Sequence, residues 1–257
     1  SVNASKLAEA LESEEDGAVV SISVGQAADE VFVALTGDAV KALENKRSLF
    51  VVSTPNGSYA LPAAEVEIDR MAERLGQADL AEIVVRVVIA RSDADKDERM
   101  RLAAEDRGFD VMVSPVDFAV IASNGGNTAE ADRFSEFVKR ELPLPEGVRP
   151  DEVATAVILE QDGALRHVPT YVTEREGKYY AVIHSLTNST YAVISNPARF
   201  ADVERHWAEA AVNDLASRLI ANGREADRFH PDASVTRAEF AAFAVRALGL
   251  SSRGGVP

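Results

Sequence analysis

The chain has 257 residues, of which 46% are hydrophobic and 27% are charged, enough for one or two folded domains with a sizeable core. Its net charge of −15 repels phosphate backbones, which argues against nucleic acid as a partner. It has no cysteine, which excludes disulfides, thiol nucleophiles and zinc–thiolate sites, and no apolar run approaches the ~20 residues of a membrane span.

The charge is unevenly distributed along the chain. Residues 199–257 hold 8 basic and 8 acidic side chains, whereas residues 1–198 hold 19 basic and 34 acidic ones and carry the whole net charge. The periodicity of the apolar residues changes at the same place, from strand-like to helical. We therefore predict two domains, an acidic β-rich module over 1–195 and a second domain over 196–257.

The first half of the module mixes strand-like and helix-like segments. β-branched runs predict strands at 18–24, 30–35 and 83–90, and helical spacing predicts helices at 5–11, 38–46, 68–75 and 92–106. The sequence Thr54-Pro-Asn-Gly57 joins two further β-like runs and predicts a hairpin, because Pro presets φ and Asn-Gly accepts positive φ. An alternative division of the module into two lobes falls near 92–108.

The second half of the module is strand-like almost throughout. Strands are predicted at 109–114, 116–122, 153–159, 165–168, 171–174, 179–183 and 190–194. From 153 onward, turn signals recur every 8–12 residues, which is typical of an antiparallel meander or sandwich. The predicted fold class is α+β: a β-rich N-terminal region with a few short helices, followed by a small all-α helix–loop–helix domain.

The most specific local signal is a helix start at Thr236. Thr236 at the N-cap and Glu239 three residues later form a capping box, and Val235 can pack on Phe240 as a hydrophobic staple. Arg237 falls at the first helical position, where the positive end of the helix dipole disfavours a cation. An arginine beside free backbone N–H groups makes a small anion-binding corner instead, so Arg237 is a candidate ligand-binding residue.

Trp207, the only tryptophan, lies at the entry of the preceding helix. Its spacing with Ala211, Leu215 and Leu219 predicts a single buried stripe along that helix. Two compatible interpretations of Trp207 follow: a core anchor, and a ring whose edge or face stacks on a sugar.

Five motifs follow one another in this last segment. In chain order they are Phe200-x-Asp-Val-x-x-His-Trp-Ala208, Asn222-Gly223, Phe229-x-Pro-Asp232, Val235-Thr-Arg-Ala-Glu-Phe240 and Arg246-Ala-Leu-Gly-Leu250. Together they resemble one S-layer homology (SLH) domain of a Gram-positive, Bacillales-like cell-surface protein. The resemblance covers roughly residues 200–250.

The resemblance implies non-covalent anchoring to secondary cell-wall polymers, which often bear pyruvylated N-acetylmannosamine, and an extracellular location in the cell wall or S-layer. In the family the Thr-Arg-Ala-Glu motif supplies a key arginine, matched here by Arg237. The polymer-binding residues expected from the resemblance are Arg237, Trp207, Asp202, Gly223 and Thr236, with Thr236 and Glu239 also capping the helix.

SLH domains usually come in threes, but this sequence holds one copy, and its tail at 251–257 resembles a linker to a next repeat. We therefore expect either a fragment of a longer protein or further SLH repeats that associate in cis or in trans. The loop after Gly223 also departs from the family pattern, because Glu225 and Asp227 stand where glycines are common. Those carboxylates either repel an anionic ligand or stiffen the loop.

Other constellations carry less information. Asp93-x-Asp-x-Asp97 has calcium-like spacing, but Glu98 and Ala104 stand where an EF-hand loop needs Gly and Glu, which favours a solvated helix start. The four histidines lie on separate elements, and no nucleophile, zincin or phosphate-loop motif is present in the sequence. We expect no metal, no cofactor and no enzymatic activity: the β-rich region is a spacer or interaction module. The alternatives are an adhesin and the anchor-proximal part of an SLH-anchored carbohydrate-active enzyme.

Overall fold

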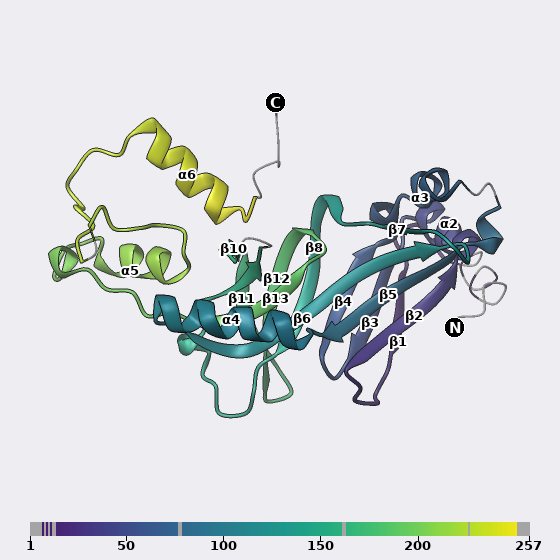
Figure 1. Cartoon of the computed structure of the whole chain (residues 1–257), viewed down its shortest axis with the longest axis horizontal. Helices are drawn as coiled ribbons and strands as arrows, with labels where there is room; N and C mark the ends of the chain where they lie inside the picture. The colour runs from purple at the N-terminus through teal and green to yellow at the C-terminus, as the bar shows by residue number, and fades with distance from the viewer. Residues whose placement is uncertain are drawn as a thin grey trace. The chain divides into compact units, whose positions relative to one another are not determined.

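A computed structural model describes Leu7, Glu9, Leu11 and residues 14–76, 79–160, 163–225 and 227–250 (Figure 1). The tail at 251–257, expected to be a linker, lies outside the described residues, as does most of the helix expected at 5–11. No helix of the described residues is long and apolar enough to cross a membrane.

The chain divides into two compact units, and each is assembled from segments that are far apart in the sequence. Unit 1 comprises Ser1–Ser92, Val116–Pro143 and His184–Thr190, and unit 2 comprises Asp93–Pro115, Leu144–Ile183 and Tyr191–Pro257. Strands β6 (Asp110–Ser123) and β12 (Lys178–Thr187) each pass through both units. The domain boundary at 195/196 and the alternative split near 92–108 stay predictions.

From residue 14 onward, the described part of unit 1 consists mainly of strands, with two α-helices and two short 3-10 helices. Its elements are β1 (Val19–Ser23), β2 (Glu30–Thr36), α2 (Gly37–Asn45), β3 (Leu49–Thr54), β4 (Gly57–Pro62), η1 (Ala63–Val66), α3 (Ile68–Leu75), η2 (Leu80–Glu82), β5 (Val84–Arg91), β7 (Thr128–Glu130) and β8 (Arg133–Pro143). Helix α3 buries Ile68, Met71 and Leu75 at helical spacing, which fixes it to the core of this unit.

Unit 2 contains the rest of the strands and the C-terminal helices. Its elements are α4 (Ala94–Arg107), η3 (Pro150–Glu152), β9 (Thr155–Leu159), β10 (Leu165–Val168), β11 (Thr170–Arg175), most of β13 (Thr190–Ser195), η4 (Ala201–Val203), α5 (Glu209–Ser217) and α6 (Arg237–Ala247). One apolar cluster of this unit joins α4 to strands β9 and β13 through Met100, Val157 and Ile194.

Across the described residues the strands form two sheets, ordered β1-β3-β4-β8-β12-β11 and β10-β9-β13-β6-β5-β2, and β7 pairs with β6. Strands β1 and β3 run parallel, with β2 and α2 in the crossover connection between them. The pairs β3–β4, β4–β8, β11–β12, β9–β10, β9–β13, β2–β5, β5–β6 and β6–β7 are antiparallel. The predicted α+β class with a β-rich N-terminal region is thus confirmed. So is the 54–57 hairpin, in which Thr54 pairs with Gly57 across the turn.

Two features of the strands differ from the sequence-based expectation. The two strands predicted at 109–114 and 116–122 form one continuous strand, β6. Pro115 is tolerated inside it because the ladder with β5 begins only at Val116, so no hydrogen bond from position 115 to β5 is needed. Strand β8 was not predicted, since its charged sequence hides the strand signal.

Strand β8 places an arginine in the core of unit 1. Arg140 is fully buried, and its guanidinium donates to the Thr187 carbonyl and to Asn188 Oδ1, both at 2.8 Å. The guanidinium also lies 4.7 Å from the centroid of the Tyr59 ring. Hydrogen bonds and ring contacts therefore compensate for the loss of water around this buried cation.

Candidate functional site

The C-terminal helix–loop–helix lies in unit 2 and includes α5 and α6 (Figure 1). Its own apolar core is small and consists of Phe200, Val203, Val212 and Ala216, with Phe229 packed against it. The rings of Phe200 and Phe229 lie 5.6 Å apart between centroids, so they join the segment before α5 to the loop after it.

The buried stripe of α5 is not the one that the sequence spacing predicts. Helix α5 begins at Glu209, so Trp207 lies in the turn before it and is 89% exposed. Val212 and Ala216 face the core, whereas Leu215 is 39% exposed. The expectation failed because it took Trp207 as the first residue of the stripe, whereas Trp207 precedes the helix and the buried positions lie one residue after Ala211 and Leu215.

Asp202 fastens the loop between the helices to the segment before α5. One carboxylate oxygen accepts a hydrogen bond from the Phe229 N–H at 2.9 Å, and the other accepts one from the His230 N–H at 2.7 Å. These backbone donors lower the pKa of Asp202, because they stabilise the carboxylate. Both oxygens are thus committed to the fold of the loop.

Gly223 lies where the loop crosses Phe200. A Cβ at this position would come within 2.6 Å of the Phe200 ring and 2.5 Å of the Glu225 carbonyl oxygen, so only glycine fits. Glu225 also pairs with Arg228 in an isolated β-bridge, and its carboxylate lies 3.0 Å from His230 Nε2. Of the two roles considered for Glu225, these contacts favour stiffening of the loop.

The start of α6 has the geometry of a capping box. Thr236 Oγ1 accepts a hydrogen bond from the Glu239 N–H at 3.2 Å, and the Glu239 carboxylate accepts one from the Thr236 N–H at 2.8 Å. Arg224, which the sequence analysis did not single out, also donates to both oxygens of Glu239, each at 3.1 Å. The Thr236 N–H and hydroxyl, followed by Arg224, lower the pKa of Glu239.

Three of the predicted site residues are exposed, namely Trp207, Thr236 and Arg237, and Thr236 is engaged in the capping box. Arg237 is the first residue of α6 and is exposed, and among the described residues it has no hydrogen-bond or ion-pair partner. Trp207 lies beside His206, with 5.4 Å between ring centroids, and His206 Nε2 lies 3.3 Å from the Asp232 carboxylate. The side chains of Arg237 and Trp207 are thus accessible from solution.

A hollow of about 350 Å³ lies between the loop and α6. Arg224, His230 and Glu239 contribute polar groups to its lining, and Phe229, Val235 and Phe240 contribute apolar ones. Val235 and Phe240 were expected to pack as a hydrophobic staple; they line the same hollow and are each more than half exposed. No cluster of three metal-ligating side chains occurs within the described ranges.

Fold and site together describe a β-rich α+β chain that carries a small helix–loop–helix domain with an exposed arginine and an exposed tryptophan. Residues 199–241 match the family model of the S-layer homology domain, and they form an SLH domain in this chain. SLH domains bind cell-wall polymers and hold proteins outside the cell, and this domain gives the chain a location at the bacterial cell surface.

Three proteins with sequence similarity to this chain are enzymes by name. The chain is 35% identical over 65 residues to endo-1,4-beta-xylanase A of Thermoanaerobacterium saccharolyticum and 37% identical over 62 residues to an amylopullulanase of Thermoanaerobacterium thermosulfurigenes. It is 34% identical over 65 residues to exoglucanase XynX of Acetivibrio thermocellus. These matches cover 25%, 24% and 25% of this chain but only 6%, 3% and 6% of those proteins. No solved structure matches the chain.

Proposed function

We propose that the SLH domain is the cell-wall anchor of this protein, that its ligand is a pyruvylated secondary cell-wall polymer, and that Arg237 receives the ketal carboxylate. The observation that carries this proposal is the open guanidinium at the first residue of α6. A guanidinium binds a carboxylate through charge-assisted hydrogen bonds, and free N–H groups at the same helix end add positive potential.

The other predicted site residues divide into one contact residue and three supporting ones. Trp207 contacts the polymer, since a ring that is 89% exposed offers a face on which a sugar can stack. Asp202, Gly223 and Thr236 act indirectly: they hold the loop and the helix start in shape through the contacts described above. Their loss affects binding through the fold.

Further SLH repeats, in cis or in trans, complete the anchor. The support for this part of the proposal is the apolar surface left open at the start of α6, where Phe240 is 66% exposed and Val235, just before the helix, is 55% exposed. No residue of α6 is buried in the described part of the chain, although the helix contains two phenylalanines. Apolar surface of this kind marks an interaction site in a soluble domain.

The β-rich region acts, in this proposal, as a spacer or interaction module and not as an enzyme. Its acidic charge keeps it soluble and repels it from an anionic wall, whereas the SLH domain, with equal numbers of acidic and basic residues, is not repelled. A second candidate function comes from the names of the relatives: a xylanase, an amylopullulanase and an exoglucanase. In that case the chain is the anchor-proximal part of an anchored carbohydrate-active enzyme. An adhesin is the third alternative.

Sedimentation with purified cell walls tests the anchoring function. The full chain is mixed with walls that retain their secondary polymer and with walls from which the polymer has been extracted. We expect the chain to pellet only with the first, and free polymer to release it. Equal pelleting with both preparations would show that the secondary polymer is not the ligand. No pelleting even of several linked copies would overturn the anchoring function itself.

A further inference from the structure

The C-terminal end of α6 lies against strand β10 within unit 2. Arg166 of β10 donates a hydrogen bond from Nη1 to the Gly249 carbonyl and another from Nε to Glu160 Oε1 at 2.6 Å. The guanidinium therefore satisfies a backbone carbonyl just beyond the helix, at the end where the helix dipole favours a cation. Its side chain is 15% exposed, so this is a largely enclosed contact.

The approach of α6 to β10 is close at the level of the backbone. Gly249 has φ +61°, and a Cβ there would come within 3.0 Å of the His167 carbonyl oxygen and 3.2 Å of Val168 Cα. The glycine thus serves two purposes: it allows the left-handed turn that ends the helix, and it leaves room for the strand beneath.

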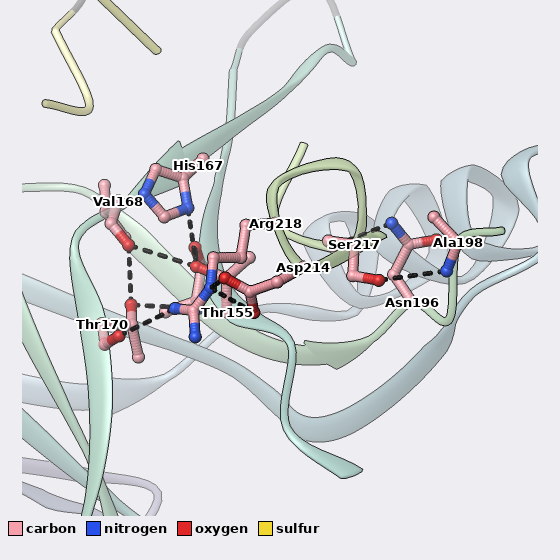
Figure 2. A network of polar contacts seen from close by, with 10 residues as sticks. Thr155, His167, Val168, Thr170, Asn196, Ala198, Asp214, Ser217 and Arg218 are labelled. Carbon is pink, nitrogen blue, oxygen red and sulfur yellow. Dashed lines mark hydrogen bonds and ion pairs between the residues drawn. The ribbon is translucent and has the colours of Figure 1, made fainter. Parts of the chain in front are cut away.

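His167 and Thr155 form the buried centre of this contact (Figure 2). His167 Nδ1 lies 2.7 Å from Thr155 Oγ1, and both side chains are almost completely buried. The histidine ring also has a hydrogen bond to the backbone of Ala247 at the end of α6. A neutral ring that accepts from Thr155 and donates to Ala247 satisfies both contacts, so the histidine joins β9, β10 and α6.

Helix α5 ends on the same surface. Arg218 donates to the Thr170 carbonyl of β11 at 3.2 Å and pairs with both oxygens of Asp214 at 3.0 and 3.1 Å (Figure 2). Leu219, the next residue, packs against the apolar cluster that contains Met100 and Val157. The C-terminal end of α5 therefore contacts strand β11, and the C-terminal end of α6 contacts strand β10.

We propose that the surface of strands β9 to β11 is the packing partner of the SLH domain and that the domain depends on these strands for its stability. The proposal rests on three observations: a small apolar cluster with four buried members between the helices, a helix α6 with no buried residue of its own among those described, and the polar contacts above. So small a core is not enough for independent stability, and the strands supply the missing cover. The anchor and its neighbouring strands are then one folding unit, and the N-terminal half of α6 remains open.

Amide hydrogen exchange on the full chain tests this inference without any ligand. Gly249→Ala adds a Cβ that clashes with β10, and Gly108→Ala is the matched control, because Gly108 ends α4 with φ +72° and open space around it. We expect Gly249→Ala to speed exchange in residues 237–248 by roughly ten- to hundredfold, with unit 1 unchanged. Gly108→Ala should leave exchange in 237–248 as in the parent.

A second pair of variants separates loss of the contact from strain in the glycine turn. Arg166→Gln removes the bond to Gly249, and Arg149→Gln removes exposed ion pairs with Asp151 and Glu152. Faster exchange in α6 for Arg166→Gln alone supports the inference. Unchanged exchange in α6 for both Arg166→Gln and Gly249→Ala would overturn it. Hydrogen exchange is measured without polymer, so a failure of cell-wall binding does not affect this test. Unchanged exchange would likewise leave the cell-wall anchoring function untouched.

Discussion

Arg237 and Thr236 are neighbours at the start of α6 but have different roles. Arg237 has no partner within the described residues and opposes the helix dipole, so Arg237→Ala should leave the melting temperature unchanged or raise it slightly. Thr236→Ala, the control, removes a helix cap and should cost about 1 kcal/mol. Thermal unfolding followed by circular dichroism measures both. A large loss of stability in Arg237→Ala would assign the arginine to the fold.

His167 gives the contact between α6 and β10 a dependence on pH. Burial and the nearby Arg218 lower its pKa from 6.5 to about 4, while the Ala247 backbone and Asp214 act weakly in the opposite direction. Between these two values the unfolded chain binds one proton more than the folded chain, so stability falls as the pH drops. The contribution of the neutral histidine to the free energy of unfolding is complete above pH 6.5. It decreases by roughly 3 kcal/mol between pH 6.5 and pH 4.

The variant His167→Asn isolates this effect. Asparagine keeps an acceptor near Thr155 but does not titrate, so its unfolding free energy should depend less on pH between 6.5 and 4 than that of the parent. Urea unfolding at pH 7 and pH 4.5 provides the comparison, and the difference between the two proteins removes the common effect of the carboxylates. Parallel pH dependence in both would contradict the assigned role of His167.

Local sequence patterns predict the residues of the site better than its tertiary contacts. The Thr236–Glu239 cap could be predicted because both partners lie within one helical turn. The hydrogen bonds from Arg224 to Glu239 could not be predicted, because the two residues are 15 positions apart and no spacing rule links them. The Arg166 bond to Gly249 spans 83 residues and depends entirely on how the helix meets the strand.

At the scale of elements, strands with apolar β-branched residues were predictable and the charged strand was not. The hairpin at 54–57 and β9 to β13 follow from turn residues and alternation. Strand β8 was not predicted because Arg140 occupies a buried position at which an alternating strand pattern has an apolar residue. Its partners, Asn188 and Tyr59, come from distant segments, so the sequence gives no sign that this cation is satisfied.

Helix α5 offers a direct test of its corrected buried face. Val212 is buried in the small SLH core, whereas Leu215 is 39% exposed. Val212→Ala should therefore cost roughly 1–2 kcal/mol, and Leu215→Ala should change stability by less than about 0.5 kcal/mol. Chemical denaturation measures the pair. If Leu215→Ala were the more costly change, the stripe expected from the sequence would be the correct one.

At the scale of the whole molecule, the uneven charge distinguishes the anchor from the rest. Equal numbers of acidic and basic residues in 199–257 contrast with the net charge of −15 carried by 1–198. The sequence motifs place the SLH resemblance at roughly 200–250 and the family model matches residues 199–241, while the domain boundary at 195/196 stays a prediction. The sequence could not indicate that β9 to β11 pack beside the domain, because such contacts depend on tertiary structure.

A single SLH domain should bind cell walls weakly, and linked copies should bind more tightly. Joining two binding modules raises the effective concentration of the second, so two linked copies should gain roughly 10²-fold or more in apparent affinity. Sedimentation of one copy and two joined copies, at equal concentrations of binding domains, measures the gain. Tight binding by a strictly monomeric single chain would contradict the need for further repeats.

The most direct measurement titrates the full chain and Arg237→Ala with a pyruvylated N-acetylmannosamine saccharide and with the same saccharide lacking the ketal, followed by NMR. We predict that the parent prefers the pyruvylated saccharide and that Arg237→Ala weakens its binding by roughly 1.5–3 kcal/mol, the value of a charge-assisted hydrogen bond. The substitution should leave the ketal-free saccharide almost unaffected. Equal affinity of the parent and Arg237→Ala for the pyruvylated saccharide would contradict the proposal that Arg237 anchors this protein to its cell wall.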